Sequence, residues 1–144
     1  MTKWEKAVDL FNQGYLCSSA VFGAYAEELG IDFETAVKVA TPFGSGMRKA
    51  EVCGAATGAL MVIGAKFGQK SVEESRVLVN GLTERFLEEF ARENGSYLCC
   101  DLLKCDISTA EGVSYAKEKK LFTTVCPKMV ESAVKVLEKV LGEI

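Results

Sequence analysis

The 144-residue sequence contains no histidine. Hydrolysis by a cysteine–histidine pair is therefore excluded, because that chemistry needs a histidine side chain as the general base beside the thiol. Long apolar runs are also absent: residues 55–67 come nearest, and Gly58, Gly64 and Lys66 interrupt them. Because a transmembrane helix needs about 18 or more apolar residues, we expect no membrane span.

The chain also lacks an excess of basic charge. Its 17 lysines and arginines against 20 acidic residues give a net charge of -3, and the two signs are interspersed along the chain. We therefore exclude nucleic acid as a partner. The first residues carry no apolar segment followed by a small-residue cleavage site, so no secretory signal is predicted and a cytoplasmic location is expected.

What is present is a series of helical segments separated by glycine or proline. No segment alternates apolar and polar residues for long enough to predict a strand, so we expect an all-α fold, a single compact multi-helix domain over residues 1–144. The longest predicted helix carries an apolar stripe of Leu78, Leu82, Phe86 and Phe90, assigned to the core. Capping boxes are expected for the pairs Thr2 with Glu5, Ser71 with Glu74 and Ser108 with Glu111. The predicted helices cover residues 2–13, 18–29, 32–40, 51–67, 71–94, 97–104, 108–119 and 127–141.

Six cysteines concentrate the reactive side chains in one chemistry. A chain of this length folds without disulfide staples, and cysteine-rich cytosolic proteins are more often metal-binding or redox-active than cross-linked. Cys17, Cys53 and Cys126 stand at predicted helix starts, and Cys99 and Cys100 lie near the start of a short helix. Since the unpaired N–H groups there favour an anion, we expect thiols of lowered pKa.

The segment from Cys53 to Gly58 places two glycines four residues apart on one helix face. Each interior glycine costs about 0.8–1.0 kcal/mol of helix propensity relative to alanine, so another interaction must offset it. Close packing of a second helix is one interpretation. The other is that Gly54 and Gly58 line a tight cofactor pocket beside Cys53, and both can hold at once.

Five motifs follow one another along the chain: Cys17-Ser18-Ser19-Ala20-Val21, Cys53-Gly54-Ala55-Ala56-Thr57-Gly58, Gly95-Ser96-Tyr97-Leu98-Cys99, Leu102-Leu103-Lys104-Cys105-Asp106 and Cys126-Pro127-Lys128. Their order resembles the C_GCAxxG_C_C family of redox-active proteins over nearly the whole chain. The family's four cysteines map onto Cys17, Cys53, Cys99 and Cys126; many relatives carry one where Cys105 stands, and Cys100 is an extra. The resemblance implies a small bacterial or archaeal redox-active protein. The chain is also similar to a domain of split-Soret cytochromes, where an iron–sulfur cluster accompanies haem, although it has no haem attachment motif.

The preferred hypothesis is a reversible dithiol/disulfide pair that exchanges electrons with a thiol partner protein, an oxidoreductase acting on thiols. Cys53 is the expected attacking thiolate, and Cys126, Cys99 or Cys17 would resolve the mixed disulfide. No Cys-x-x-Cys motif is present, so the fold must assemble any pair. We therefore expect Cys17, Cys53 and Cys126 to converge in space, and this model requires no cofactor.

Two alternatives stay open. In the first, thiolates hold an iron–sulfur cluster or a zinc ion, with ligands drawn from Cys17, Cys53, Cys99, Cys105 and Cys126. The sequence lacks the close ligand pair that such sites usually include. In the second, the protein is a helical interaction protein with buried structural cysteines. A homo-oligomer is compatible with each of these functions.

Overall fold

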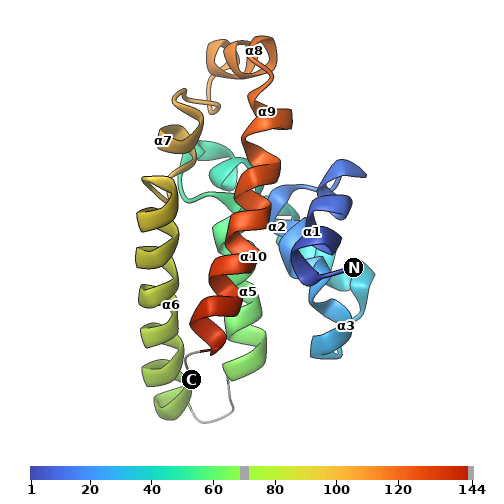
Figure 1. The fold of residues 1–144 in the computed structure, drawn as a ribbon, viewed down its shortest axis with the longest axis vertical. Helices are drawn as coiled ribbons and strands as arrows, with labels where there is room; N and C mark the ends of the chain where they lie inside the picture. Colours follow the sequence, from blue (N-terminus) through green and yellow to red (C-terminus); the bar gives the residue numbers. More distant parts are fainter. Residues whose placement is uncertain (69–71, 143–144) are drawn as a thin grey trace.

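The computed structural model describes residues 1–68 and 72–142. Within these ranges the protein is built of helices joined by short loops and contains no strand, so the predicted all-α class is confirmed (Figure 1). The only extended pairing in the same ranges is an isolated antiparallel bridge between Val52 and Leu98. No helix in the described part of the chain is long and apolar enough to cross a membrane.

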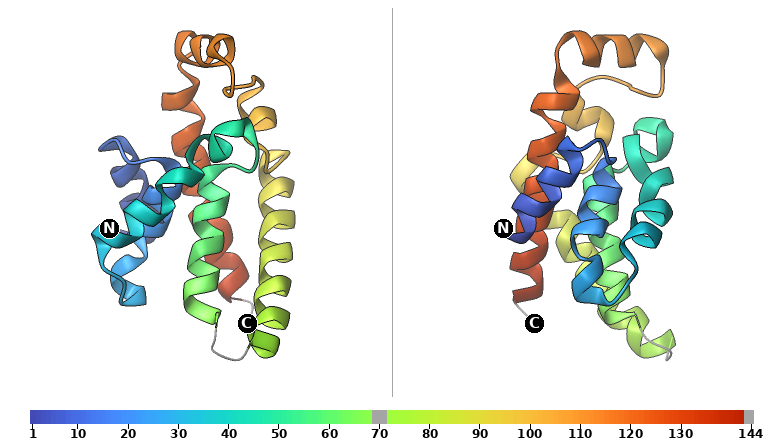
Figure 2. Two further views of the ribbon diagram at one scale, coloured as in Figure 1. Left: turned by 180° about the vertical axis from the view of Figure 1, so that it is seen from behind. Right: turned by 90° about the vertical axis from the view of Figure 1, so that its right-hand side faces the viewer.

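The first four helices pack as a group beside three longer ones (Figure 2). Helix α2 lies at the centre of the group and contacts α1, α4, α5 and α10. Two buried hydroxyls join it to α4, because Ser18 donates to the Ala40 carbonyl (2.7 Å) and Ser19 to the Val37 carbonyl (2.8 Å). The group consists of α1 (Lys3–Asn12), α2 (Cys17–Ala24), α3 (Ala26–Leu29) and α4 (Phe33–Ala40).

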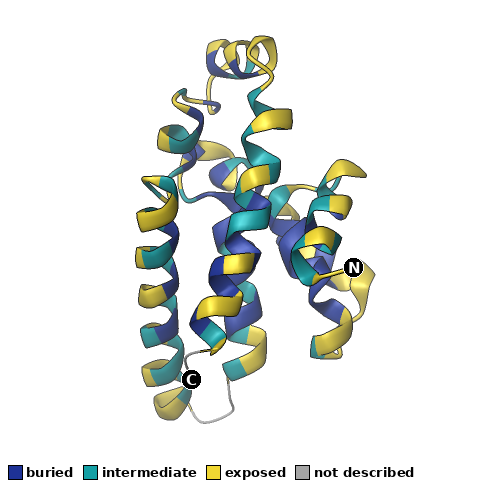
Figure 3. Ribbon diagram, viewed as in Figure 1, coloured by how far each residue is buried: buried dark blue, intermediate teal, exposed yellow. Residues whose placement is uncertain are grey.

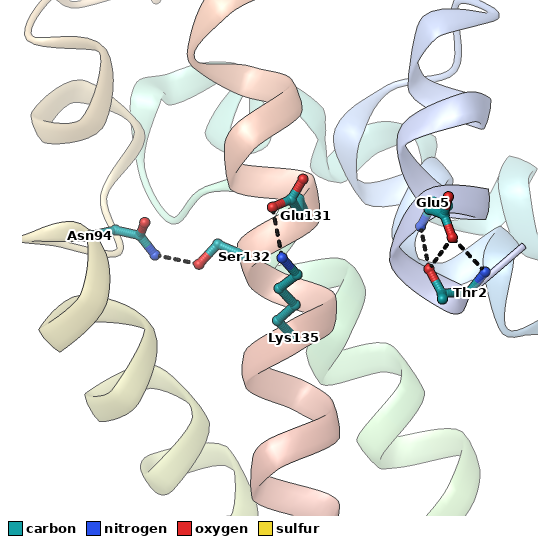
Figure 4. A network of polar contacts seen from close by, with 6 residues as sticks. All are labelled: Thr2, Glu5, Asn94, Glu131, Ser132 and Lys135. Carbon is teal, nitrogen blue, oxygen red and sulfur yellow. Dashed lines mark hydrogen bonds and ion pairs between the residues drawn. The ribbon is translucent and has the colours of Figure 1, made fainter.

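Three long helices, α5 (Gly54–Phe67), α6 (Val72–Asn94) and α10 (Cys126–Gly142), form the body of the molecule. Their facing sides are buried and their outer sides are exposed (Figure 3). The stripe predicted on α6 faces this core: Phe86 and Phe90 are fully buried, and their rings stack at a centroid separation of 5.7 Å. At the upper end of α6, Asn94 donates to the Ser132 hydroxyl on α10 at 2.8 Å (Figure 4).

The remaining helices gather at one end of the bundle (Figure 1). They are α7 (Cys99–Leu103), α8 (Ala110–Glu118) and α9 (Leu121–Thr124). Their apolar side chains form a second, smaller hydrophobic cluster, separate from the main core and centred on Cys99, Leu103, Ile107 and Ala116. The sequence did not predict α9, whose single turn is too short to show a helical period.

The loop between α4 and α5 reaches the same end of the molecule. It comprises η1 (Thr41–Phe43), a turn of 3-10 helix, and η2 (Gly46–Ala50), a tight left-handed loop. Within η2 the φ angles of Gly46, Met47, Arg48 and Ala50 lie between 54° and 65°. Such angles are rare for residues other than glycine, so side-chain pattern alone could not predict this conformation.

Helix starts follow the predictions in part. The capping box of Thr2 and Glu5 is confirmed (Figure 4), and α4 starts at Asp32, whose carboxylate accepts the Thr35 N–H. The box predicted for Ser108 and Glu111 is wrong, because Thr109 is the N-cap and accepts the Gly112 N–H. The box predicted for Ser71 lies outside the described residues.

The second helix starts one residue before its predicted range of 18–29. Helix α2 begins at Cys17, with Leu16 as its N-cap, and not at Ser18 or Ser19. Both hydroxyls are buried and bond to α4 instead of capping their own helix. A serine near a helix start has the same short polar side chain in either role, so the sequence could not distinguish them.

Candidate redox site

Four cysteines stand at the starts of four helices. Cys17, Cys99 and Cys126 are the first residues of α2, α7 and α10, and Cys53 is the N-cap of α5. All four line one cavity of about 350 Å³ at the end of the bundle where α7 and α9 lie. The predicted convergence of Cys17, Cys53 and Cys126 is therefore observed, and Cys99 joins them.

Backbone pairing brings two of these cysteines together. The Cys53 N–H donates to the Tyr97 carbonyl at 2.8 Å, and the Cys99 N–H donates to the Glu51 carbonyl at 2.6 Å. These bonds flank the bridge between Val52 and Leu98. They join the segment before α5 to the segment before α7, so the two helix starts are held side by side.

The cavity wall is mostly apolar and comes from helices far apart in the sequence. The loop from Gly14 to Leu16 forms one part of it, together with Ser45 and Gly46 of the left-handed loop. A thiol in such a wall is largely removed from water. The larger apolar side chains of the lining include Phe11, Leu102, Ile107, Phe122, Val125 and Met129.

Three glycines beside the cysteines have different roles. Gly54 lines the cavity, and a Cβ there would lie 3.1 Å from the Phe43 carbonyl oxygen. Gly58 is not among the lining residues; a Cβ on it would come within 2.7 Å of the Ser18 carbonyl oxygen, so it serves the packing of α5 on α2. Gly46 lines the cavity, and its φ of 59° and the nearness of the Glu51 backbone favour glycine.

The predicted lowering of the thiol pKa values is wrong. Burial raises the pKa of Cys53 and of Cys99 to about 12 in each case, and it also raises the pKa of Cys17 and of Cys126. The second cause for Cys53, Cys99 and Cys126 is repulsion between neighbouring thiolates, above all with Cys17. Loss of hydration and mutual repulsion therefore outweigh the helix N-termini.

Backbone amides nevertheless oppose the rise in the pKa of two of the thiols. The amides of residues 17, 18 and 45 act to lower the pKa of Cys17, and those of Ala55 and Ala56 act to lower the pKa of Cys53. The helix starts thus act to lower the thiol pKa values as predicted, but by less than burial and repulsion raise them. A positive group among the four sulfur atoms would remove the repulsion and reverse the balance.

Two cysteines lie off the cavity. Cys100 and Cys105 are partly buried and pack against the second hydrophobic cluster, and neither is among the lining residues. Cys105 was a candidate ligand in the metal alternative, and its position does not support that role. Its place on the loop after α7 follows from Lys104, which ends that helix with a φ of 57°.

The four cavity cysteines are not arranged around a single ion. In the described part of the chain, no group of three Cys, Asp or Glu side chains is arranged to hold one metal ion. Two of the cavity cysteines, Cys53 and Cys17, pack with the main core, whereas Cys99 and Cys126 pack with the second cluster. The cavity thus lies on the boundary between the two hydrophobic clusters.

Fold and site together define a helical protein in which four of the six cysteines line one cavity. The family model described as "Putative redox-active protein (C_GCAxxG_C_C)" matches residues 15–140, so the chain belongs to that family and has a redox role. Neither the curated proteins nor the solved structures include a match.

The sequence did not predict the rest of the lining. Gly14, Ser45, Phe122 and Thr123 line the cavity, but they come from loops and a short helix that no periodic pattern marks. A signal was present in the paired glycines of Gly44-Ser45-Gly46, which predicted a loop but not its nearness to Cys99. Loop paths depend on tertiary contacts, and these are not encoded locally.

Proposed function

We propose that Cys17, Cys53, Cys99 and Cys126 bind an iron–sulfur cluster and that this is the redox group of the protein. One observation carries the proposal: four thiols from four helix starts line a single, mostly apolar cavity of about 350 Å³. A disulfide pair needs no such space. Four cysteine thiolates are the usual ligand set of iron–sulfur clusters, whose irons are separate atoms, so the thiolates need not meet at one point.

The donor set fits such a group chemically. Protonated thiols are favoured in the cavity by burial and by repulsion among thiolates, as the raised pKa of each one indicates. Bound iron cations offset both the cost of burying a thiolate and the repulsion among thiolates, because a thiol that coordinates a metal loses its proton. When bound, an iron–sulfur cluster supplies reversible electron transfer without a change in the polypeptide bonds.

The chain's own residues set the environment. The backbone amides of Ala55 and Ala56 act to lower the pKa of Cys53, and those of Ser18 and Ser45 act to lower the pKa of Cys17, so they favour negative charge on these sulfur atoms. The wall formed by Phe11 and Phe122 with their neighbours is mostly apolar, which lowers the polarity around the sulfur atoms. Hydrogen bonds to sulfur and exclusion of solvent are the means by which proteins adjust a cluster's potential.

The experiment is purification without oxygen, followed by measurement of visible absorption, iron and acid-labile sulfide. We expect stoichiometric iron and sulfide, and their loss in Cys53→Ser and Cys126→Ser. The matched control is Cys100→Ser, which removes a cysteine that lies off the cavity. Circular dichroism checks that each variant folds. Protein that stays free of iron after anaerobic reconstitution contradicts the proposal, and so does equal loss in Cys100→Ser.

Dithiol/disulfide exchange is the second candidate, and the exposure of the thiols favours it. Cys17 and Cys126 are only partly buried, so a partner could reach them. In this model the Cys126 thiolate attacks a partner disulfide and releases one partner thiolate; a second cavity thiolate then attacks the mixed disulfide and releases the other. The expectation that Cys53 attacks first is replaced on the ground of exposure, because Cys53 is only 7% exposed whereas Cys126 is partly exposed. Burial raises the pKa of both thiols, so the pKa does not distinguish them.

A thiol count separates the two functions in one preparation. Under the dithiol function, a mild oxidant removes two free thiols per molecule, a reductant restores them, and a chelator changes nothing. Under the cluster function, the oxidant or chelator releases iron, and four cavity thiols become free together. Zinc is less well supported, since its ligands must surround one ion and no described group of three does so.

A further inference from the structure

The fold separates charge that is mixed along the sequence. Residues 45–52 and 97–128, which form the end of the molecule around the cavity, contain seven basic and five acidic residues. The rest of the chain contains ten basic and fifteen acidic residues. The cavity end is therefore positive in a protein of net charge -3, although the two signs alternate along the sequence.

Ion pairing strengthens this separation. Outside the cavity end, seven basic side chains pair with carboxylates: Lys3, Lys6, Lys38, Lys66, Arg92, Lys135 and Lys139. At the cavity end no basic side chain forms an ion pair with a residue that the structure describes. The exposed cations there include Arg48, Lys49, Lys104, Lys120 and Lys128.

Three of these cations occupy backbone positions that favour glycine. Arg48, Lys104 and Lys120 have φ angles of 65°, 57° and 57°. A left-handed conformation costs a side-chain-bearing residue about 1–2 kcal/mol. Strained positions of this kind concentrate at functional sites, and here each one carries an unpaired positive charge.

All three cations adjoin residues that line the cavity. Arg48 follows Ser45 and Gly46, Lys104 follows Leu103, and Lys120 precedes Phe122. Exposed side chains suited to protein contact lie on the same segments: Met47 is 42% exposed and Tyr97 is 38% exposed. Arginine, methionine and tyrosine are enriched in protein interfaces.

We propose that the cavity end, defined by Met47, Arg48, Tyr97, Lys104 and Lys120, is the docking surface for an acidic electron-transfer protein. The proposal rests on the proposed redox function and adds its partner. The positive cavity end would attract the acidic partner, whereas the negative charge of the rest of the protein would repel it. The partner would therefore approach with its acidic face toward the cavity.

The test uses two inorganic oxidants of opposite charge with the reduced protein. Hexacyanoferrate(III), an anion, and hexaammineruthenium(III), a cation, each accept one electron and become the corresponding reduced complexes. Raising ionic strength from about 20 to 200 mM screens charge beyond about a Debye length. We expect salt to slow the reaction with hexacyanoferrate and to accelerate the reaction with hexaammineruthenium, because local charge dominates. If salt instead accelerates the reaction with hexacyanoferrate and slows the reaction with hexaammineruthenium, as the negative net charge alone would predict, the proposal is overturned.

Charge reversal locates the effect. Lys104→Glu with Lys120→Glu should lower the low-salt rate with hexacyanoferrate by on the order of tenfold and reverse its salt dependence. The control is Arg76→Glu with Lys66→Glu, which changes the net charge equally at the opposite end of the bundle. Circular dichroism confirms folding of both variants. An equal effect of both pairs overturns the proposal.

Two polyanions identify the kind of partner. Poly-L-glutamate should compete with hexacyanoferrate at low salt, whereas a short DNA duplex should not compete more strongly. Stronger competition by the duplex overturns the assignment of a protein partner. Failure of the proposed redox function is recognised separately. In that case the protein takes up no electrons from dithionite, and this is seen before any oxidant is added.

Discussion

At the scale of the residue, the burial of Cys53 decides its reactivity. Its folded pKa of about 12 lies above the ordinary thiol value, chiefly because the side chain has lost its hydration. The folded state therefore holds the proton more tightly than the unfolded state. The corresponding stability is fully present below the unfolded pKa of about 8.5 and is lost as pH rises toward the folded value.

The first prediction concerns labelling of the reduced, metal-free protein. At pH about 8, iodoacetamide should modify Cys53 at least about tenfold more slowly than Cys105, because the reactive species is the thiolate. Peptide mass spectrometry measures each rate. The melting temperature of the same protein should decrease as the pH rises from about 9 to about 12. The decrease should be smaller in Cys53→Ala. Faster labelling of Cys53 than of Cys105 would restore the original hypothesis of an activated thiolate.

At the scale of the element, α5 contains two interior glycines with opposite surroundings. A Cβ on Gly58 would lie 2.7 Å from the Ser18 carbonyl oxygen of α2, whereas nothing lies within 4 Å of a Cβ on Gly64. The close approach of α5 to α2 therefore depends on Gly58. It also fixes the separation of Cys53 and Cys17, which stand at the starts of these two helices.

The second prediction compares one substitution at both positions. Gly58→Ala should lower the free energy of unfolding by about 1–3 kcal/mol, because backbone must move to accept the methyl group. Gly64→Ala should raise it by about 0.5–1 kcal/mol, because alanine is the better helix former. Urea denaturation measures both. Equal effects at the two positions would mean that the helices do not pack at this glycine.

The elements also show what the sequence could predict. The start of α1 after Thr2 followed from its capping box, and α10 starts one residue before the predicted Pro127, because a cap and a proline act within a few residues. The left-handed loop at Met47 and Arg48 did not follow from such a signal, since neither residue favours positive φ without tertiary support. The four cavity cysteines were predicted as a set; the raised pKa values were not, because burial depends on the complete fold.

At the scale of the whole molecule, the cavity joins two hydrophobic clusters of unequal size. The main core contains the buried faces of α5, α6 and α10, and the second cluster contains α7 to α9. Each cluster supplies two of the four cavity cysteines. A group bonded to all four would therefore link the small cluster to the large one.

The third prediction follows from this link. With metal bound, backbone amides of α7 and α9 should exchange with deuterium at least about tenfold more slowly than in metal-free protein, because local opening would break metal–sulfur bonds. Amides around Val136 in the main core serve as the internal control and should change less. Hydrogen exchange with mass spectrometry measures both regions. Equal protection of α7 and α9 in the two forms would mean that the cavity holds no such link.

The position of Cys126 in the chain sets the order of events during biosynthesis. Three of the cavity cysteines are synthesised by residue 99, but the fourth opens the last helix. Until α10 has been made and has docked against α1 and α6, the ribosome-bound chain presents an incomplete set of thiols. Under the proposed cluster function, the redox group is therefore acquired only after α10 has docked, and a chain that misfolds before then cannot be loaded.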